Sequence, residues 1–353
     1  MLKIQIKWNS VRVASLPRKS AAFSLFNLLL KLFLYCDMMR SALRAVPLPE
    51  TSSMRRRHVF TLVALGFTVV LLGWGAVVTS IEAGLAVPDW PTTFDSIDPI
   101  NPTPDWYKIP PVLAEHGHRL MGMIVGALTL LLAFWTFFAD PRPWMKRIGL
   151  FALLLVILQG VLGGLRVVWI SLDLAVVHAC TAQLFFATLV SMAFFTSGSW
   201  LRAEGVLIEG EAATRFRRLS VLTAVLLYGQ IILGALLRHR GDGVDPMLAG
   251  IHMLGAAVVF AMVFMTIKAA RQADPEKTLV SKLSHGLAGI LTLQIILGFA
   301  AYFIILKDID SMRTTLQVVL NTTHMVVGAL FFATTIGLVL LAARKAVPKE
   351  ETA

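Results

Sequence analysis

Long apolar runs dominate this chain and alternate with short polar segments. Crossing about 30 Å of hydrocarbon takes a helix of about 20 apolar residues. Eight runs reach that length, at roughly 58–80, 118–138, 147–170, 176–196, 217–237, 249–268, 284–306 and 320–342. Because no backbone polar group can stay unpaired in lipid, each run must be helical. The pattern predicts an all-α integral membrane protein with eight transmembrane helices.

The composition agrees with this interpretation and excludes a soluble protein. Of the 353 residues, 57% are hydrophobic and 15% charged, and the mean hydropathy is +0.74. A net charge of +11 would suit a nucleic-acid partner. However, the basic residues gather in alternate loops, such as Arg57 before the first span and Arg142 in the second loop. This positive-inside distribution predicts cytoplasmic termini, an outer loop at 81–117 and no nucleic-acid partner.

An internal repeat organises the spans. The motif Gln-x-x-Leu-Gly occurs at 159–163, 230–234 and 294–298, late in odd-numbered spans, and 73–79 is a weaker counterpart. Each copy is followed by an outer loop and then by a histidine near the head of the next span. Two such hairpins make a four-helix half, and both halves enter the membrane in the same sense. The repeat predicts two four-helix bundles related by a pseudo-twofold axis along the membrane normal.

Four histidines mark the even-numbered spans: His118, His178, His252 and His324. An ionisable side chain in a membrane helix is costly and is therefore a functional candidate. The alternative for any one of them is a simple hydrogen bond to a neighbour. Four in register favour two bis-histidine sites, His118 with His178 and His252 with His324. Haem is the cofactor that best suits paired imidazoles in an apolar bundle.

The remaining histidines receive other interpretations. His116 is two residues before His118 and faces another side of the helix, while His58, His239 and His285 are interpreted as structural or solvated. The motif glutamines could bond across helices or reach the second nitrogen of a histidine. The motif glycines could serve helix packing or haem clearance.

The two halves differ at Glu115, which lies three residues before His118 and therefore on the same helix face. It could take protons or stabilise a cationic intermediate; the alternative is an acid that complements the helix dipole. The second half has no carboxylate at that spacing. This difference indicates a chemical site in the first half and an electron-transfer site in the other.

Two further features belong to the outer side. The 81–117 loop is rich in proline and tryptophan, which indicates either an ordered cover over the first half or an interfacial aromatic belt. Three arginines near the outer face are candidate contacts for haem propionates, with solvated loop arginines as the alternative: Arg119, Arg166 and Arg238.

The chain divides into five regions. They are an N-terminal extension unlike the rest (1–53), a first half (54–198), a cytoplasmic linker (199–218), a second half (219–343) and a cytoplasmic tail (344–353). The two cysteines are Cys36 in the extension and Cys180 inside a span, so no structural disulfide is indicated.

Taken together, these motifs resemble the haem A synthase family of cytochrome oxidase assembly proteins. The resemblance rests on Gly-Leu-Ala-Val-Pro-Asp-Trp-Pro at 84–91, Glu-His-Gly-His-Arg at 115–119, the Gln-x-x-Leu-Gly repeats and the four histidines. It covers about 55–342. The chain departs from the family pattern at 77–80, where an arginine is missing, and in having no cysteine in its outer loops.

The resemblance implies oxidation of the C8 methyl of haem O to the formyl of haem A. It places the substrate haem at His118 and His178, with Glu115 catalytic, and a b-type haem on His252 and His324. It also implies a bacterial-type cytoplasmic membrane, supply of haem O by a farnesyltransferase, contact with oxidase assembly factors and a candidate homo-oligomer. The alternatives are a di-haem electron-transfer cytochrome and a haem transporter or chaperone.

Overall fold

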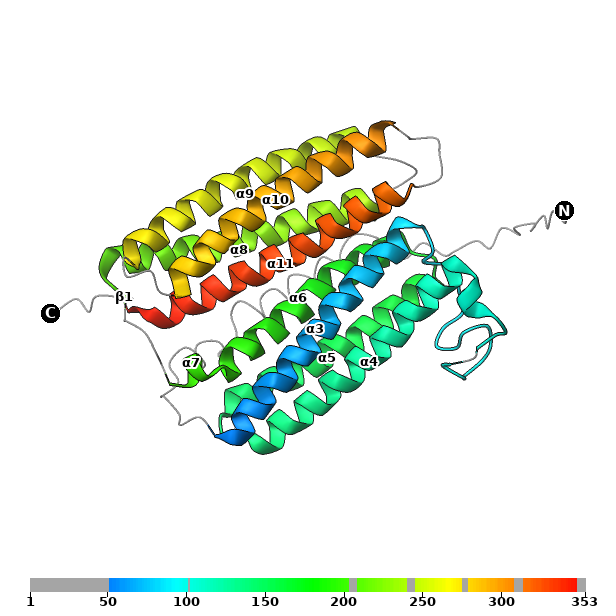
Figure 1. Cartoon of the computed structure of the whole chain (residues 1–353), viewed down its shortest axis with the longest axis horizontal. Helices are drawn as coiled ribbons and strands as arrows, with labels where there is room; N and C mark the ends of the chain where they lie inside the picture. Colours follow the sequence, from blue (N-terminus) through cyan, green and yellow to red (C-terminus); the bar gives the residue numbers. More distant parts are fainter. Residues whose placement is uncertain are drawn as a thin grey trace, which may run out of the picture.

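The computed structural model describes residues 51–100, 102–202, 208–239, 245–274, 279–307 and 314–347. Its eight long helices are α3 (Ser52–Ser80), α4 (Pro110–Ala139), α5 (Pro143–Val168), α6 (Leu172–Thr196), α8 (Gly210–His239), α9 (Pro246–Ala273), α10 (Leu279–Lys307) and α11 (Thr315–Lys345). All eight are long and apolar enough to span a membrane. The predicted multi-pass, all-α architecture is confirmed (Figure 1).

Most helices begin several residues before the apolar run that predicted them. Proline in the first turn starts α4, α5 and α9, and side chains of Thr51, Ser171 and Asp245 cap α3, α6 and α9. Because of these proline and capping residues, each helix includes several residues that precede its apolar run. As a result, the four histidines lie six to nine residues after the first residue of their helices. The sequence had predicted that most of them lie at the helix start.

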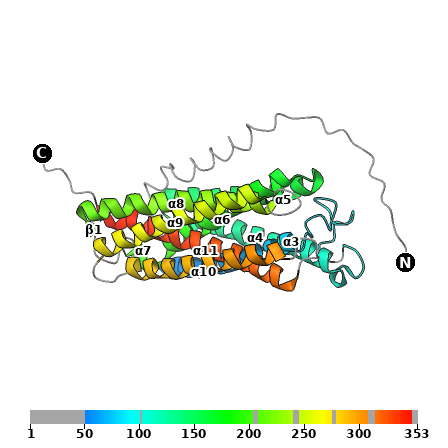
Figure 2. The ribbon, with the colours of Figure 1, turned by 90° about the horizontal axis from the view of Figure 1, so that it is seen from above.

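The helices form two rings of four. In the first half α3, α4, α5 and α6 pack in a closed ring, and α8, α9, α10 and α11 do the same in the second half. The rings meet where α3 packs on α11, α6 on α8, and α6 on α11. A twofold axis that exchanges the halves would generate these contacts, so the packing is compatible with the predicted pseudo-symmetry. Figure 2 shows the helices of both halves sharing one long direction.

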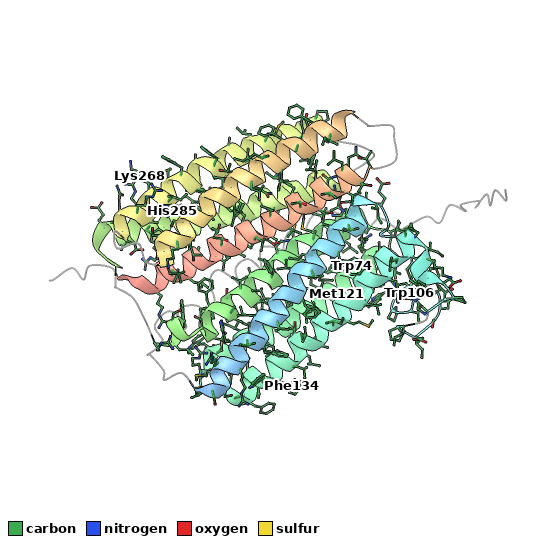
Figure 3. All side chains as sticks on the ribbon, viewed as in Figure 1. Trp74, Trp106, Met121, Phe134, Lys268 and His285 are labelled. Atoms are coloured by element: carbon green, nitrogen blue, oxygen red, sulfur yellow. The ribbon has the colours of Figure 1, made fainter. Side chains whose placement is uncertain are left out.

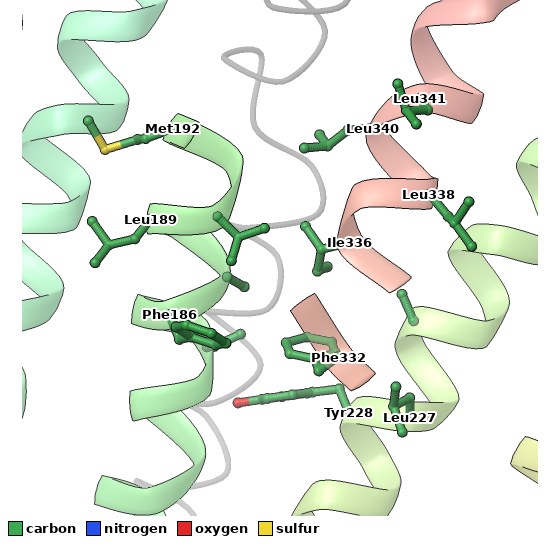
Figure 4. Close-up of a cluster of buried hydrophobic side chains, with 14 of the residues drawn as sticks. Phe186, Leu189, Met192, Leu227, Tyr228, Phe332, Ile336, Leu338, Leu340 and Leu341 are labelled. Atoms are coloured by element: carbon green, nitrogen blue, oxygen red, sulfur yellow. The ribbon is translucent and has the colours of Figure 1, made fainter. Parts of the chain in front are cut away.

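Large apolar side chains fill the junction between the halves (Figure 4). Phe186 of α6 and Phe332 of α11 are buried there. The Tyr228 ring of α8 stacks on Phe332 with 5.6 Å between ring centroids, and its hydroxyl donates to the backbone oxygen of Cys180 at 3.0 Å. Helices α6, α8 and α11 therefore hold the two rings together.

One charged cluster differs from the sequence interpretation. Arg57 and Arg142 were assigned to polar segments outside the spans, yet both are buried. Asp140, at the end of α4, accepts from Arg57 at 2.5 Å and from Arg142 at 2.8 Å. Arg142 also donates to the backbone oxygen of Phe195 at 2.9 Å. The carboxylate and the carbonyl compensate the charges that burial removes from water.

The helix connections at this end include small elements. The short helix α7 (Gly198–Leu201) follows α6, and the two-residue strand β1 (Ile208–Glu209) pairs in parallel with β2 (Ala346–Val347). Part of the predicted linker is helical, because α8 begins at Gly210. Residues 1–50, with Cys36, lie outside the described residues. The start of α3 and the end of α11 lie at the same end of the bundle (Figure 1).

Candidate haem sites

Each of the four histidines packs against a glycine on the preceding helix. The pairs are Gly75 with His118, Gly163 with His178, Gly234 with His252, and Gly298 with His324. A Cβ at any of these glycines would lie 3.0–3.2 Å from the imidazole Cε1. Two roles were considered for the motif glycines, helix packing and haem clearance. The contact corresponds to helix packing, with each glycine directly against an imidazole. Gly75 packs against His118 in the same way, although its helix lacks the full Gln-x-x-Leu-Gly motif. The weaker match to the repeat at 73–79 was the feature of the sequence that indicated this site.

The structure brings the predicted histidine pairs together. His118 is close enough to act electrostatically on His178, and His252 on His324. Within the described residues, no group of three or more histidine, cysteine, aspartate or glutamate side chains could hold a bare metal ion. A porphyrin iron needs only two axial donors, so two imidazoles per half form a donor set that fits haem.

The motif glutamines reach across to the histidine helices. The amide nitrogen of Gln230 donates to the backbone oxygen of His252 at 2.7 Å and lies 3.1 Å from its Nδ1. The amide nitrogen of Gln294 lies 3.3 Å from Nε2 of His324. Both roles considered for these glutamines, an interhelical bond and contact with the imidazole, are therefore present.

Gln159 occupies the same place beside His178. In the amide orientation that satisfies both of its polar atoms, its nitrogen lies 3.1 Å from Nδ1 and 3.1 Å from the backbone oxygen of His178. Its oxygen then accepts from the Thr181 hydroxyl at 2.5 Å. All three copies of the motif thus place a glutamine amide against an imidazole.

Glu115 is buried beside the first histidine pair, with 5% of its surface exposed. Its Oε1 lies 3.4 Å from Nε of Arg119, and Arg166 also acts on it electrostatically. The helix-dipole explanation weakens, because α4 begins at Pro110 and Glu115 lies beyond the first turn, where that effect is concentrated. Its partners are these two arginines, and its place on the His118 face of α4 follows from the three-residue spacing.

Arg119 fastens the outer loop to α4. Its guanidinium donates to the backbone oxygens of Val87 at 3.1 Å, Asp89 at 2.8 Å and Thr92 at 3.1 Å. His116 adds a second attachment through Pro99, whose backbone oxygen lies 3.0 Å from its Nε2. Sequence reasoning separated His116 from the ligands but did not find this anchoring role. Arg119 as a propionate contact stays a prediction.

The other two arginines lie in the last turns of α5 and α8. Arg166 donates to the backbone oxygen of Gly84 at 2.8 Å and acts electrostatically on His118 and His178. Arg238 donates to the Ser80 hydroxyl across the junction of the halves at 2.6 Å. It also acts electrostatically on His324. Each arginine therefore lies near one histidine pair.

The outer loop has a structure of its own. Asp89 accepts from the Thr92 hydroxyl at 2.5 Å and from the backbone amides of Phe94 at 2.8 Å and Asp95 at 2.9 Å. Partial burial raises the pKa of this carboxyl, but the hydrogen bonds outweigh burial and bring the pKa below its ordinary value.

Three tryptophans lie in or beside this ordered region. The Trp90 ring packs against Gly164 of α5, where no Cβ could fit. Figure 3 shows Trp74 and Trp106 at this end of the first half, whereas Lys268 and His285 lie at the opposite end of the second half. The contacts favour an ordered cover over a simple aromatic belt.

The fold and site define a class: multi-pass helical membrane proteins with a histidine pair inside each of two four-helix halves. The chain belongs to the family described as cytochrome oxidase assembly protein, whose profile matches residues 8–190 and 106–248.

Curated relatives are named heme A synthase. One from an Exiguobacterium species is 29% identical over 184 residues, 51% of this chain and 56% of the relative. One from Lysinibacillus sphaericus is 30% identical over 181 residues, covering 50% and 55%. One from Shouchella clausii is 28% identical over 192 residues, covering 53% and 59%. The chain thus spans just over half the length of the relatives it matches.

Proposed function

We propose that this protein is a haem A synthase, an oxidoreductase that converts the C8 methyl of haem O to the formyl of haem A. The first half takes the substrate haem between His118 and His178. The second half keeps a haem b between His252 and His324. The observation that carries the proposal is Glu115, a buried carboxylate beside one histidine pair and without a counterpart three residues before His252.

The residues present fit haem in both halves. Each pair supplies two imidazoles on facing helices, and each imidazole is seated against a glycine at which a methyl group would force the ring to shift by a few tenths of an ångström. Haem b, when bound, supplies one-electron transfer through its iron. Arg166 and Arg238 are the residues placed to pair with propionates, because each lies near a histidine pair at the outer end of the bundle.

Glu115 supplies the chemistry that the histidines cannot. Converting a methyl to a formyl group is a four-electron oxidation: written with water as the oxygen source, R–CH3 + H2O gives R–CHO, four protons and four electrons. The reaction therefore needs an electron acceptor outside the residues described, and groups that take up the protons. A buried carboxylate can accept such a proton or stabilise positive charge that develops next to the ring. Arg119 and Arg166 hold its orientation through their charges, and Arg119 also fastens the outer loop at this end.

The cellular setting follows from the same proposal. The protein lies in a bacterial-type cytoplasmic membrane with both termini in the cytoplasm and both histidine pairs near the outer face. Haem O reaches it from the farnesyltransferase that makes it, and haem A leaves toward oxidase assembly factors.

The test is co-expression with a source of haem O, followed by pigment extraction and mass analysis. Wild type should yield haem A. Glu115→Ala should lower the yield by about 10²- to 10⁴-fold, the usual contribution of a general acid or base, while total bound haem stays the same. The matched control is Asp105→Asn, because Asp105 is an exposed acid in the same outer region.

Two results would contradict the proposal. Haem b held in both halves with no modified haem would identify an electron-transfer cytochrome, which the presence of a histidine pair in each half also suits. Haem released unchanged to an acceptor protein would identify a transporter or chaperone.

A further inference from the structure

The four histidine sites are built alike except at one position. In three of them a glutamine lies four residues, about one helical turn, before the glycine that seats the imidazole. In the fourth, Leu71 stands four residues before Gly75, in the place that glutamine takes elsewhere. Leu71 is partly buried and packs against the hydrophobic core. His118 is therefore the only one of the four whose preceding helix offers an apolar side chain at this position.

The contacts follow that difference. His178, His252 and His324 each have a glutamine amide nitrogen within 3.3 Å of a ring nitrogen. Nδ1 of His118 is buried and has no hydrogen-bond partner. Nδ1 of His324 also has none, but its other ring nitrogen faces Gln294.

Helices α3 and α4 are joined differently from the other pairs. The indole nitrogen of Trp74 donates to the backbone oxygen of Ala114 at 2.9 Å, and the Trp74 ring packs against Gly117. This contact fixes the two backbones relative to each other without touching the imidazole of His118. The two helices are thus joined through Ala114 and Gly117, while Nδ1 of His118 has no partner.

A polar partner on the non-coordinating side of a histidine orients the ring and tunes its strength as a ligand. The ring nitrogen that does not hold iron carries a proton, so the atom it needs there is the glutamine amide oxygen, which a half-turn of the amide presents. Without it, the imidazole can rotate away from iron more easily. The net value of one such bond corresponds to about two- to twelvefold in a rate. In the second half, then, a glutamine amide lies beside both imidazoles; in the first half, beside only one.

We propose that His118 is the exchangeable ligand of the first-half site, and that Leu71 makes it so by replacing the glutamine of the other three sites. His178 is the retained ligand. The proposal rests on the proposed function, in which the first half must take up a substrate haem and release a product while the second keeps its cofactor. Leu71 is accordingly a positioning residue that acts through His118.

The test uses carbon monoxide binding to the reduced, haem-loaded full-length protein, purified in detergent. Carbon monoxide can bind a bis-histidine iron only after one imidazole leaves, so the rate reports ligand release. The wild-type first-half haem should bind faster than the second-half haem, and the first-half phase is identified as the one that remains in His252→Ala. Leu71→Gln should slow the first-half phase about two- to twelvefold. Leu71→Met, of similar size but without an amide, should not.

A reciprocal variant covers the case in which Leu71→Gln fails to fold. Gln294→Leu should speed binding at the second-half haem and bring it toward the first-half rate. Equal rates in both halves of wild type, the same rate for Leu71→Gln and Leu71→Met, or no acceleration in Gln294→Leu would overturn the proposal. Absence of haem from wild type would instead reject the proposed function itself.

Discussion

The two halves share a scaffold but differ at one end. Both have four helices, a glycine-seated histidine pair and an arginine near the outer end. Among the described residues, only the first half carries a long ordered loop and a buried glutamate. In the second half no more than seven residues separate consecutive helices. The comparison teaches that the packing shared by both halves positions two facing imidazoles. The features that distinguish the first half are the Glu115 carboxylate and the outer loop at 81–117.

The strongest way to sharpen the comparison is to remove one ligand from each half. His252→Ala should strip the retained haem b, because one axial imidazole remains where two are needed. His178→Ala should empty the first half and leave the second loaded. Pyridine haemochrome spectra of the purified variants measure the outcome. An unchanged reduced spectrum in His252→Ala would refute the assignment of the second half.

A second change detaches the feature that only the first half has. Arg119→Ala removes three bonds to loop carbonyls. A hydrogen bond to a charged group contributes about 1.5–3 kcal/mol, so local opening of the loop should become easier by several kcal/mol. Limited proteolysis of residues 84–99 measures this opening. Lys108→Ala, which breaks only an exposed ion pair, is the control, and equal cleavage of both variants would reject the anchoring role.

A third change tests a feature common to both halves. A Cβ at Gly163 would lie 3.2 Å from Cε1 of His178, so Gly163→Ala should displace the imidazole at a cost of about 1–3 kcal/mol. The low-spin haem spectrum of the first half should shift. Gly160→Ala, one turn earlier with nothing within 4 Å, should leave the spectrum intact. If both variants behaved alike, the glycine would be a packing residue of no consequence for the ligand.

The smallest expected effect is a pH dependence confined to the first half. Hydrogen bonds hold the pKa of Asp89 below its ordinary value against the opposing effect of burial. A carboxyl with a lowered folded-state pKa contributes stability above its unfolded pKa and loses it as pH falls through the folded pKa. The protection of loop amides from hydrogen exchange, taken relative to the intrinsic exchange rate at each pH, should therefore fall at acidic pH in wild type. In Asp89→Asn this protection should be low and nearly independent of pH across that range.

Much of this architecture could be predicted from the order of residues. Apolar runs located all eight spans, since lipid forces each run to be a helix. The Gln-x-x-Leu-Gly repeat located the hairpins and identified which histidines share a half. What the runs could not give is where each helix starts, because capping by Thr51, Ser171 and Asp245 depends on polar residues outside the apolar segment.

Contacts between distant segments escaped prediction. Nothing in the spacing of Arg57 and Asp140 shows that 83 residues are bridged by a buried ion pair. Arg119 was interpreted from its place beside His118, whereas its partners are loop carbonyls that no side-chain pattern reveals. The glutamines were assigned two roles, and only the packing of helix pairs shows that the amides reach both backbone and ring.

The buried cluster of Arg57, Asp140 and Arg142 bears on the order of membrane assembly. Leaving one charge of such a cluster buried without its partner costs about 3–5 kcal/mol. On its own, α3 would carry a guanidinium whose neutralising carboxylate is not synthesised until α4 has been completed. The cluster that ties the start of α3 to the end of α4 can therefore form only after both helices have been synthesised.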